Sequence, residues 1–238
     1  MTATKSAFLS ETYSGYYHRE IPTDEKELTH VGPGTPCGEY LRRFWQPVAM
    51  SDELKALPQA IKVMGEELVL FRHHSGGVGC LELHCSHRGT SLEFGLIEEI
   101  GIRCCYHGWL FGVDGRILDT PGEPPESTYK DRLCHGAYPV HEAIGLVFVY
   151  MGPPEKRPPF PSYDTWNIPG HCFQPIEKNI TPCNWLQMAD NFHDPVHTRF
   201  LHSIGGPQIG ELMAVPAEID WLESPIGIIV IETRRVGG

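Results

Sequence analysis

The chain has 238 residues with a hydrophobic content of 41%, enough to bury the core of one large domain or of two modest ones. Asp and Glu number 30 against 19 Lys and Arg, which gives a formal charge of −11. Because no run rich in Lys or Arg interrupts this acidity, we do not expect nucleic acid as a partner.

Residues 1–39 are polar and rich in turn-forming residues, and they predict an N-terminal arm. They contain none of the apolar core that a signal peptide needs. The longest apolar runs, residues 144–151 and 226–231, have the length of strands and are far shorter than a membrane span. We therefore expect a cytoplasmic protein with no membrane partner.

Short β-prone runs separated by turn residues extend from residue 40 to residue 154. The run 145–150 is nearly all apolar and predicts a central strand, and helical periodicity is limited to a turn or two around residues 39–44. This pattern predicts an all-β unit, a small barrel or sandwich. The predicted strands are residues 45–50, 60–64, 68–72, 78–83, 101–104, 109–111, 116–118 and 145–150.

A proline-rich segment follows at residues 152–163, with five prolines that fix φ and remove backbone donors. It cannot continue a sheet and predicts a stiff linker. After it we predict a strand at residues 173–180, a helix at residues 184–190 and a strand at residues 226–233. The predicted divisions are an arm (1–39), an all-β domain (40–154) and a second domain (155–238).

Cysteine and histidine are paired twice in the all-β unit. Cys85 and His87 form a C-x-H pair, and 16 residues later Cys104 and His107 form a C-x-x-H pair. A Rieske 2Fe-2S cluster needs two thiolates on one iron and two imidazoles on the other, which two such loops supply. Neutral imidazole ligands make this cluster easier to reduce than an all-cysteine one. The sequence therefore predicts these four residues as cluster ligands.

Gly89 and Gly108 follow the two pairs, and we expect them to let backbone amides approach the cluster sulfurs. The alternative is a zinc site. Structural zinc sites space like ligands as C-x-x-C and H-x₃₋₅-H, whereas this chain mixes the two types within each loop. The spacing favours the iron–sulfur cluster.

The segments CSHRG and CCYHGWLF resemble the two cluster loops of Rieske proteins, and GLVFVYMGP resembles the closing strand of the Rieske domain in Rieske non-haem iron oxygenases. The resemblance covers about residues 40–154 and resumes at residues 184–202. It implies an all-β Rieske domain followed by the first part of an α+β, helix-grip-like catalytic domain.

Respiratory Rieske proteins also carry a disulfide between their two loops. Here Thr90 stands where the first of those cysteines would fall, so we expect Cys105 to be a buried, unpaired thiol. The other cysteines without ligand spacing are expected to be core thiols: Cys80, Cys134, Cys172 and Cys183.

Three histidines and two carboxylates lie between Asp190 and His202. Two histidines and one carboxylate on one face of an iron leave positions open for O₂ and substrate. The spacing Asp194-x-x-His197-x₄-His202 is similar to the motif of Rieske oxygenase catalytic domains. By that resemblance His197 and His202 bind mononuclear Fe(II), and Asp194 is the catalytic acid that bridges to a cluster histidine of a neighbouring subunit.

Helical geometry leaves a plainer reading open, in which these are surface histidines. On a regular helix His193 and His197 share a face, whereas His197 and His202 lie about 140° apart and meet only if the helix is irregular. The family's third ligand, an Asp or Glu, lies over a hundred residues further on, and only 36 residues follow His202. We therefore expect that ligand beyond residue 238 and an incomplete catalytic domain.

The resemblance implies the oxygenase component of a Rieske non-haem iron system, similar to phthalate-dioxygenase-type α-subunits. An NAD(P)H-dependent reductase, alone or with a ferredoxin, would supply electrons, and O₂ would serve to hydroxylate an aromatic ring or to demethylate an aromatic substrate. A homotrimer is implied in the same way. Two alternatives remain: a Rieske electron-transfer protein, which leaves residues 194–202 unexplained, and a catalytically inactive truncated oxygenase.

Overall fold

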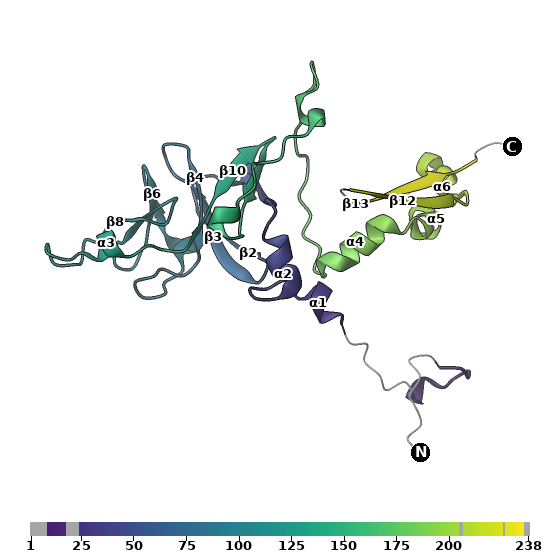
Figure 1. Cartoon of the computed structure of the whole chain (residues 1–238), viewed down its shortest axis with the longest axis horizontal. Coiled ribbons are helices and arrows are strands. Elements are labelled where there is room, and N and C mark those ends of the chain that lie inside the picture. Colours follow the sequence, from purple (N-terminus) through teal and green to yellow (C-terminus); the bar gives the residue numbers. More distant parts are fainter. Residues whose placement is uncertain (1–8, 18–23, 205–206, 226, 236–238) are drawn as a thin grey trace. The chain divides into compact units, whose positions relative to one another are not determined.

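The structure is a computed structural model that describes residues 9–17, 24–204, 207–225 and 227–235. It divides into two compact units, Met1–Ile180 and Thr181–Gly238, drawn in Figure 1. The first unit is built mainly of β-sheet, and the second has helices followed by a β-hairpin. None of the helices within these ranges is both long and apolar enough to cross a membrane. The predicted domain boundaries at residues 39 and 154 stay predictions.

Antiparallel pairing joins the strands of the first unit into three sheets within the described ranges. One sheet has the order β1-β11-β10, with bounds Gln46–Met50, Leu146–Val149 and Val140–Ala143. The second has the order β2-β3-β4-β9, with bounds Gln59–Val63, Glu66–Arg72, Val78–Glu82 and Ala137–Tyr138. The third has the order β5-β6-β7-β8, with bounds Leu96–Ile97, Gly101–Arg103, Leu110–Gly112 and Ile117–Asp119.

Short helices connect these strands. The α-helices of the first unit are α1 (Lys26–Thr29), α2 (Pro36–Leu41) and α3 (Tyr129–Arg132). Single 3-10 turns occur at Gly15–Tyr17, Ser51–Glu53, Leu92–Phe94, Pro154–Lys156 and Asp164–Asn167. Thr35 caps α2 by accepting a hydrogen bond from the Gly38 amide, and Pro36 occupies the first helical turn, where no amide donor is needed.

Strand β3 supplies both hydrophobic cores of the first unit. Its residues Leu68, Val69, Leu70 and Phe71 are fully buried. Successive side chains of a strand point to opposite faces, so Val69 and Phe71 pack in one core while Leu68 and Leu70 pack in the other. The first of these cores also contains Cys85 and Cys104, and the second contains Val147 and Val149 of β11.

The predicted all-β domain is confirmed. Each predicted strand of this domain is present, with ends within two residues of those expected, and β11 is the middle strand of its sheet as predicted. The helical turn expected near residues 39–44 is α2. Strands β5, β9 and β10 were not predicted, because runs of two to four residues carry too little periodicity to detect.

The proline-rich segment continues no sheet, as predicted, and contains one 3-10 turn. The strand predicted at residues 173–180 is wrong, since this segment has no regular secondary structure. Ile176 and Ile180 are 93% and 84% exposed, and β propensity without a partner strand does not form a ladder. Lys178 joins the segment to the 3-10 turn at Ser51–Glu53 through an ion pair with Glu53, at 2.6 Å.

The second unit begins with α4 (Trp185–His193), which confirms the predicted helix. Asn184 caps it by accepting a hydrogen bond from the Leu186 amide at 3.0 Å. The helices α5 (Val196–Leu201) and α6 (Pro207–Ala214) follow, separated by a 3-10 turn at His202–Ile204. Strands β12 (Glu218–Ser224) and β13 (Gly227–Thr233) then pair antiparallel. The strand predicted at residues 226–233 is β13. Residue 226 of that prediction lies outside the described residues.

Candidate metal centre

The two segments that carry the Cys-His pairs have the same backbone design. In residues 85–90, which we name the first ligand loop, the Cys85 amide donates to the Thr90 carbonyl at 2.9 Å and the Gly89 amide donates to the Cys85 carbonyl at 2.7 Å. Residues 104–109, the second ligand loop, repeat both bonds at equivalent positions, at 2.8 and 3.1 Å. Both loops therefore return on themselves in one tight turn.

Glycine ends each of these turns because the backbone there is left-handed. Gly89 has φ 72° and Gly108 has φ 76°, a conformation that side-chain-bearing residues rarely adopt. Their own amides close the loops, so the amides that face a sulfur come from other residues. The His87 and Arg88 amides hydrogen-bond to Cys85. These contacts reach the cysteine sulfur, and the predicted approach of backbone amides to the cluster sulfurs stays a prediction.

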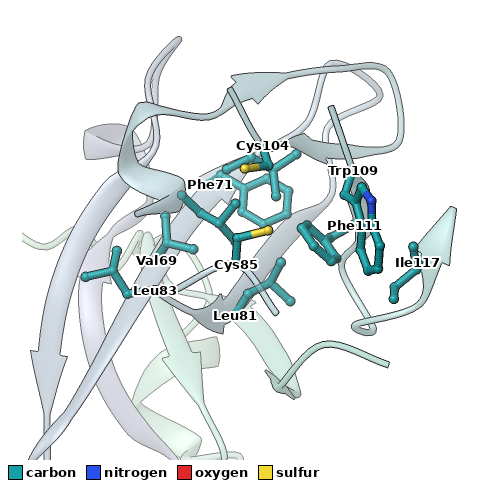
Figure 2. Packing of buried hydrophobic residues seen from close by; sticks show 11 residues of the cluster. Val69, Phe71, Leu81, Leu83, Cys85, Cys104, Trp109, Phe111 and Ile117 are labelled. Atoms are coloured by element: carbon teal, nitrogen blue, oxygen red, sulfur yellow. The ribbon is translucent and has the colours of Figure 1, made fainter. Parts of the chain in front are cut away.

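Cys85 and Cys104 bring their thiols together inside the core of the first unit (Figure 2). Each is only 3% exposed, and both pack with Phe71 and Trp109. Burial, together with contact with Cys104, raises the pKa of the Cys85 thiol to about 11, although the two amides act in the opposite direction. A metal ion reverses this preference, because it binds the thiolate and releases the proton.

The two histidines of the loops also lie together. The ring centroids of His87 and His107 are 4.7 Å apart with an interplanar angle of 69°. The His87 ring stacks on the indole of Trp109, at 4.7 Å and 2°. Burial, followed by the charges of His107 and Arg88, lowers the pKa of His87. A neutral imidazole is the form that binds a metal.

Like donors are therefore brought together in pairs: two buried thiols, and two imidazoles that are partly exposed. A Rieske cluster has this requirement, since one iron takes both thiolates and the other takes both imidazoles. Within the described part of the chain, no three His, Cys, Asp or Glu side chains converge as they would on a single metal ion. A cluster with two protein ligands on each iron does not need such a group, so the donor set fits it.

The prediction that Cys105 is a buried thiol is wrong, because its side chain is exposed. The second ligand loop turns Cys104 inward, and at its tip Cys105 and Tyr106 face solvent. Of the other expected core thiols only Cys80 is buried, since it lies on β4. The remaining three lie outside the named helices and strands and are exposed: Cys134, Cys172 and Cys183.

The histidine segment of the second unit is broken into two helices. Helix α4 ends at His193, Asp194 and Pro195 interrupt the helix, and α5 begins at Val196. His193 and His197 therefore do not share a regular helix, and His193 Nδ1 is instead 2.7 Å from the Ala189 carbonyl of its own helix.

His197 and His202 do meet, with ring centroids 5.4 Å apart. The irregularity that this pairing requires is present, because α5 ends at Leu201 and His202 begins a 3-10 turn. Asp194 lies beside the pair, with Oδ2 3.6 Å from His197 Nδ1, a buried nitrogen that has no hydrogen-bond partner. Its other oxygen accepts a hydrogen bond from the Val196 amide at 2.8 Å. Two imidazoles and a nearby carboxylate fit part of an iron site.

Sequence reasoning missed the side chains that stand directly before each ligand cysteine. His84 Nδ1 lies 3.2 Å from the Gly89 carbonyl oxygen, and Arg103 Nη1 donates to the Gly108 carbonyl at 2.5 Å. The repeated position of these two polar residues relative to the cysteines was the available signal.

Comparison with known proteins agrees with this geometry. A family model described as the Rieske 2Fe-2S domain matches residues 44–133, a range that includes both ligand loops and strands β1 to β8. The fold and the paired donors define a Rieske iron–sulfur domain.

Oxygenase subunits are among the relatives. The chain is 51% identical over 196 residues to the tert-butanol monooxygenase / tert-amyl alcohol desaturase oxygenase subunit of Aquincola tertiaricarbonis, covering 80% of this chain and 41% of that protein. It is 42% identical over 232 residues to the phenoxybenzoate dioxygenase subunit alpha of Ectopseudomonas oleovorans, covering 91% of this chain and 57% of that protein. The solved reduced complex between oxygenase and ferredoxin in carbazole 1,9a-dioxygenase matches 66% of this chain and 41% of that chain, with a TM-score of 0.54 and 31% identity.

The chain belongs to the Rieske oxygenase family, and it spans 41–57% of the length of these two curated relatives. The family model confirms the predicted 2Fe-2S cluster, and the mononuclear iron stays a prediction. The individual ligands stay predictions.

Proposed function

We propose that the chain forms part of the oxygenase component of a Rieske non-haem iron system, which uses O₂ and electrons from an NAD(P)H-dependent reductase to oxidise a small organic substrate. The observation that carries the proposal is the pairing of two buried thiols and two adjacent imidazoles on ligand loops of one design. An isolated electron carrier would not need the second histidine pair, His197 and His202.

In this proposal Cys85 and Cys104 hold one iron of the cluster, and His87 and His107 hold the other. When bound, a Rieske cluster supplies one-electron transfer at a higher potential than an all-cysteine cluster. The thiols are buried and the imidazoles partly exposed, so the imidazole side is where a redox partner reaches the site. Trp109, 4% exposed, covers one face of His87 and keeps water from it.

His197 and His202 would bind the mononuclear iron, together with a carboxylate beyond residue 238. Such a site supplies O₂ activation when the metal is bound. Asp194 lies where it can hold the proton of His197 Nδ1, which leaves Nε2 free as the ligand. The carboxylate is itself oriented by the Val196 amide, and it is half exposed, as a residue that bridges to a neighbouring subunit in a homotrimer must be.

The substrate we propose first is a small aromatic compound that is hydroxylated on its ring or oxidatively demethylated. A small tertiary alcohol is the second candidate, because one relative, 51% identical over its match, is named for tert-butanol and tert-amyl alcohol. For the electron donor, the ferredoxin complex of the carbazole enzyme supports a ferredoxin between the reductase and this chain. We propose a cytoplasmic location.

The first experiment measures iron, acid-labile sulfide and zinc in anaerobically purified protein, with electron paramagnetic resonance (EPR) of the reduced sample. We expect about two sulfides and at least two irons per chain and a Rieske-type spectrum. Zinc in place of iron would contradict the proposal.

The second experiment supplies the full-length gene product with reductase, ferredoxin and ¹⁸O₂, and offers aromatic acids, aryl methyl ethers and tertiary alcohols. Mass spectrometry then identifies any product that has gained the label. Reduction of the cluster without product formation from any substrate would favour the electron-carrier alternative.

A further inference from the structure

The two ligand loops share a second feature beyond their backbone turns. In each loop, the glycine carbonyl is held by the side chain that directly precedes the ligand cysteine, His84 in the first loop and Arg103 in the second. These two contacts differ in their exposure to solvent and in the number of hydrogen bonds that support them.

The contact in the first loop is open to solvent. The His84 side chain is 56% exposed, and its second nitrogen lies 3.5 Å from a Glu67 carboxylate that is 58% exposed. Interactions between exposed groups of this kind contribute little to conformational order.

The contact in the second loop is anchored from several elements. The Arg103 side chain is 23% exposed and forms a two-pronged contact with Glu98, through Nε and through Nη2 at 3.1 Å. Its Nη1 donates to Asp119 at 2.8 Å as well as to the Gly108 carbonyl. Four of the five guanidinium N–H groups thus have partners on the β5–β6 turn, on β8 and on the loop itself.

The peptide held in this way lies between two functional side chains. The Gly108 carbonyl belongs to the peptide that joins Gly108 to Trp109, directly after His107. Trp109 stacks on His87, so the orientation of this one peptide affects both imidazoles of the proposed cluster. The left-handed turn at Gly108 leaves the peptide with few local restraints other than the loop hydrogen bonds.

We infer that Arg103 is a positioning residue for the cluster: by fixing the Gly108 carbonyl, its planar guanidinium sets the geometry of the two histidine ligands. The inference rests on the proposed ligand assignment. Charge alone does not explain the arrangement, because Arg103 is outnumbered by its two carboxylate partners, so the three groups together carry a charge of −1. The geometric role requires the planar guanidinium of arginine, whose N–H donors point in fixed directions, and lysine lacks this group.

Arg72 offers a matched control in the same unit. Its side chain is 26% exposed, it forms a two-pronged pair with Glu142, and it donates to the Gly76 carbonyl at 3.0 Å. It also donates to the Ser51 carbonyl, and none of these partners belongs to a ligand loop. Loss of Arg72 therefore removes a comparable ion pair without touching the cluster loops.

The test compares Arg103→Gln and Arg103→Lys with Arg72→Gln and Arg72→Lys in the complete chain. Each protein is purified anaerobically, its reduced EPR spectrum is recorded, and the loss of iron to a chelator is timed. We expect both Arg103 variants to change the g values and to lose iron about 10-fold faster than wild type. Both Arg72 variants should keep the wild-type spectrum and rate, even if their melting temperatures fall equally.

A wild-type spectrum and rate in Arg103→Lys would show that charge suffices and would overturn the inference, as would equal effects of the Arg72 and Arg103 variants. If the Arg103 variants do not accumulate as folded protein, Asp119→Ala decides, since it removes the acceptor of one Arg103 hydrogen bond and leaves the guanidinium in place. Unchanged g values in that variant refute the positioning role. Absence of a Rieske spectrum from wild-type protein would overturn the ligand assignment together with the inference.

Discussion

Neighbouring residues of β3 offer a test of whether the core beneath the thiols protects the cluster. Leu70 and Phe71 are both fully buried, but their side chains point into different cores. Phe71 packs in the core that contains Cys85 and Cys104 (Figure 2). Its ring lies over Gly79 of the paired strand. Truncation of Leu70 opens a cavity on the other side of the sheet.

The expected losses of stability are similar for the two truncations. Phe71→Ala removes a whole buried ring and should reduce the free energy of unfolding by about 3–5 kcal/mol, and Leu70→Ala by about 2–5 kcal/mol. For a unit of this size, 3–5 kcal/mol corresponds to a fall in melting temperature of about 6–20 °C. Gly79, which faces the Phe71 ring, has no side chain that could move into the space left by Phe71.

The two variants should differ in how they hold iron. Because only Phe71 shares a core with the thiols, Phe71→Ala should release iron to a chelator about 10-fold faster than Leu70→Ala, at a temperature where both proteins remain folded. Circular dichroism checks the folded fraction, and the visible absorbance of the cluster follows the iron. Equal release rates would refute the reasoning that one core shields the cluster.

Three further variants test the proposed ligands and a buried histidine. His107→Cys should shift the reduced EPR spectrum towards an all-cysteine type or abolish the cluster, and an unchanged spectrum would remove His107 from the ligand set. In the full-length gene product, His197→Ala should leave the cluster spectrum intact and eliminate substrate oxidation, and normal turnover in this variant would dismiss His197 as an iron ligand. Asp194→Asn should lower turnover by about 10–100-fold. Burial lowers the pKa of His135, which is 3% exposed, so the unfolded state binds more protons and the folded state loses stability as the pH falls through 6.5 towards the folded pKa. Denaturant titrations of His135→Phe between pH 7.5 and 5 should show a shallower loss than wild type, and an equal slope would contradict this assignment.

Local patterns made much of the fold predictable. Apolar runs such as residues 68–72 and 145–150 predicted strands that are present, because each run is long enough to be buried. The linker was predictable from proline, which removes backbone donors wherever it occurs. The strand expected at residues 173–180 failed because strand formation depends on a partner that no local pattern reveals.

The ligand residues of the candidate centre were predictable from the sequence, but the contacts that hold the ligand loops in place were not. Cys85, His87, Cys104 and His107 were chosen from spacing, and the structure brings like donors together in pairs. Arg103 was missed because its partners, Glu98 and Asp119, meet it only through the folded sheet, and Cys105 was misjudged for a related reason. The direction of a loop side chain is set by what packs around the loop.

The amino-acid sequence by itself determined which atoms are available as ligands and how each ligand loop turns, since the loop hydrogen bonds span only four or five residues and the left-handed turns need glycine at fixed positions. Only the tertiary structure decided that the two loops meet. Their convergence depends on side chains of β3 and of the loops packing in one core, which joins segments distant in the sequence. Burial in that core, a property of the whole fold, also makes the Cys85 thiol reluctant to ionise until a metal replaces its proton.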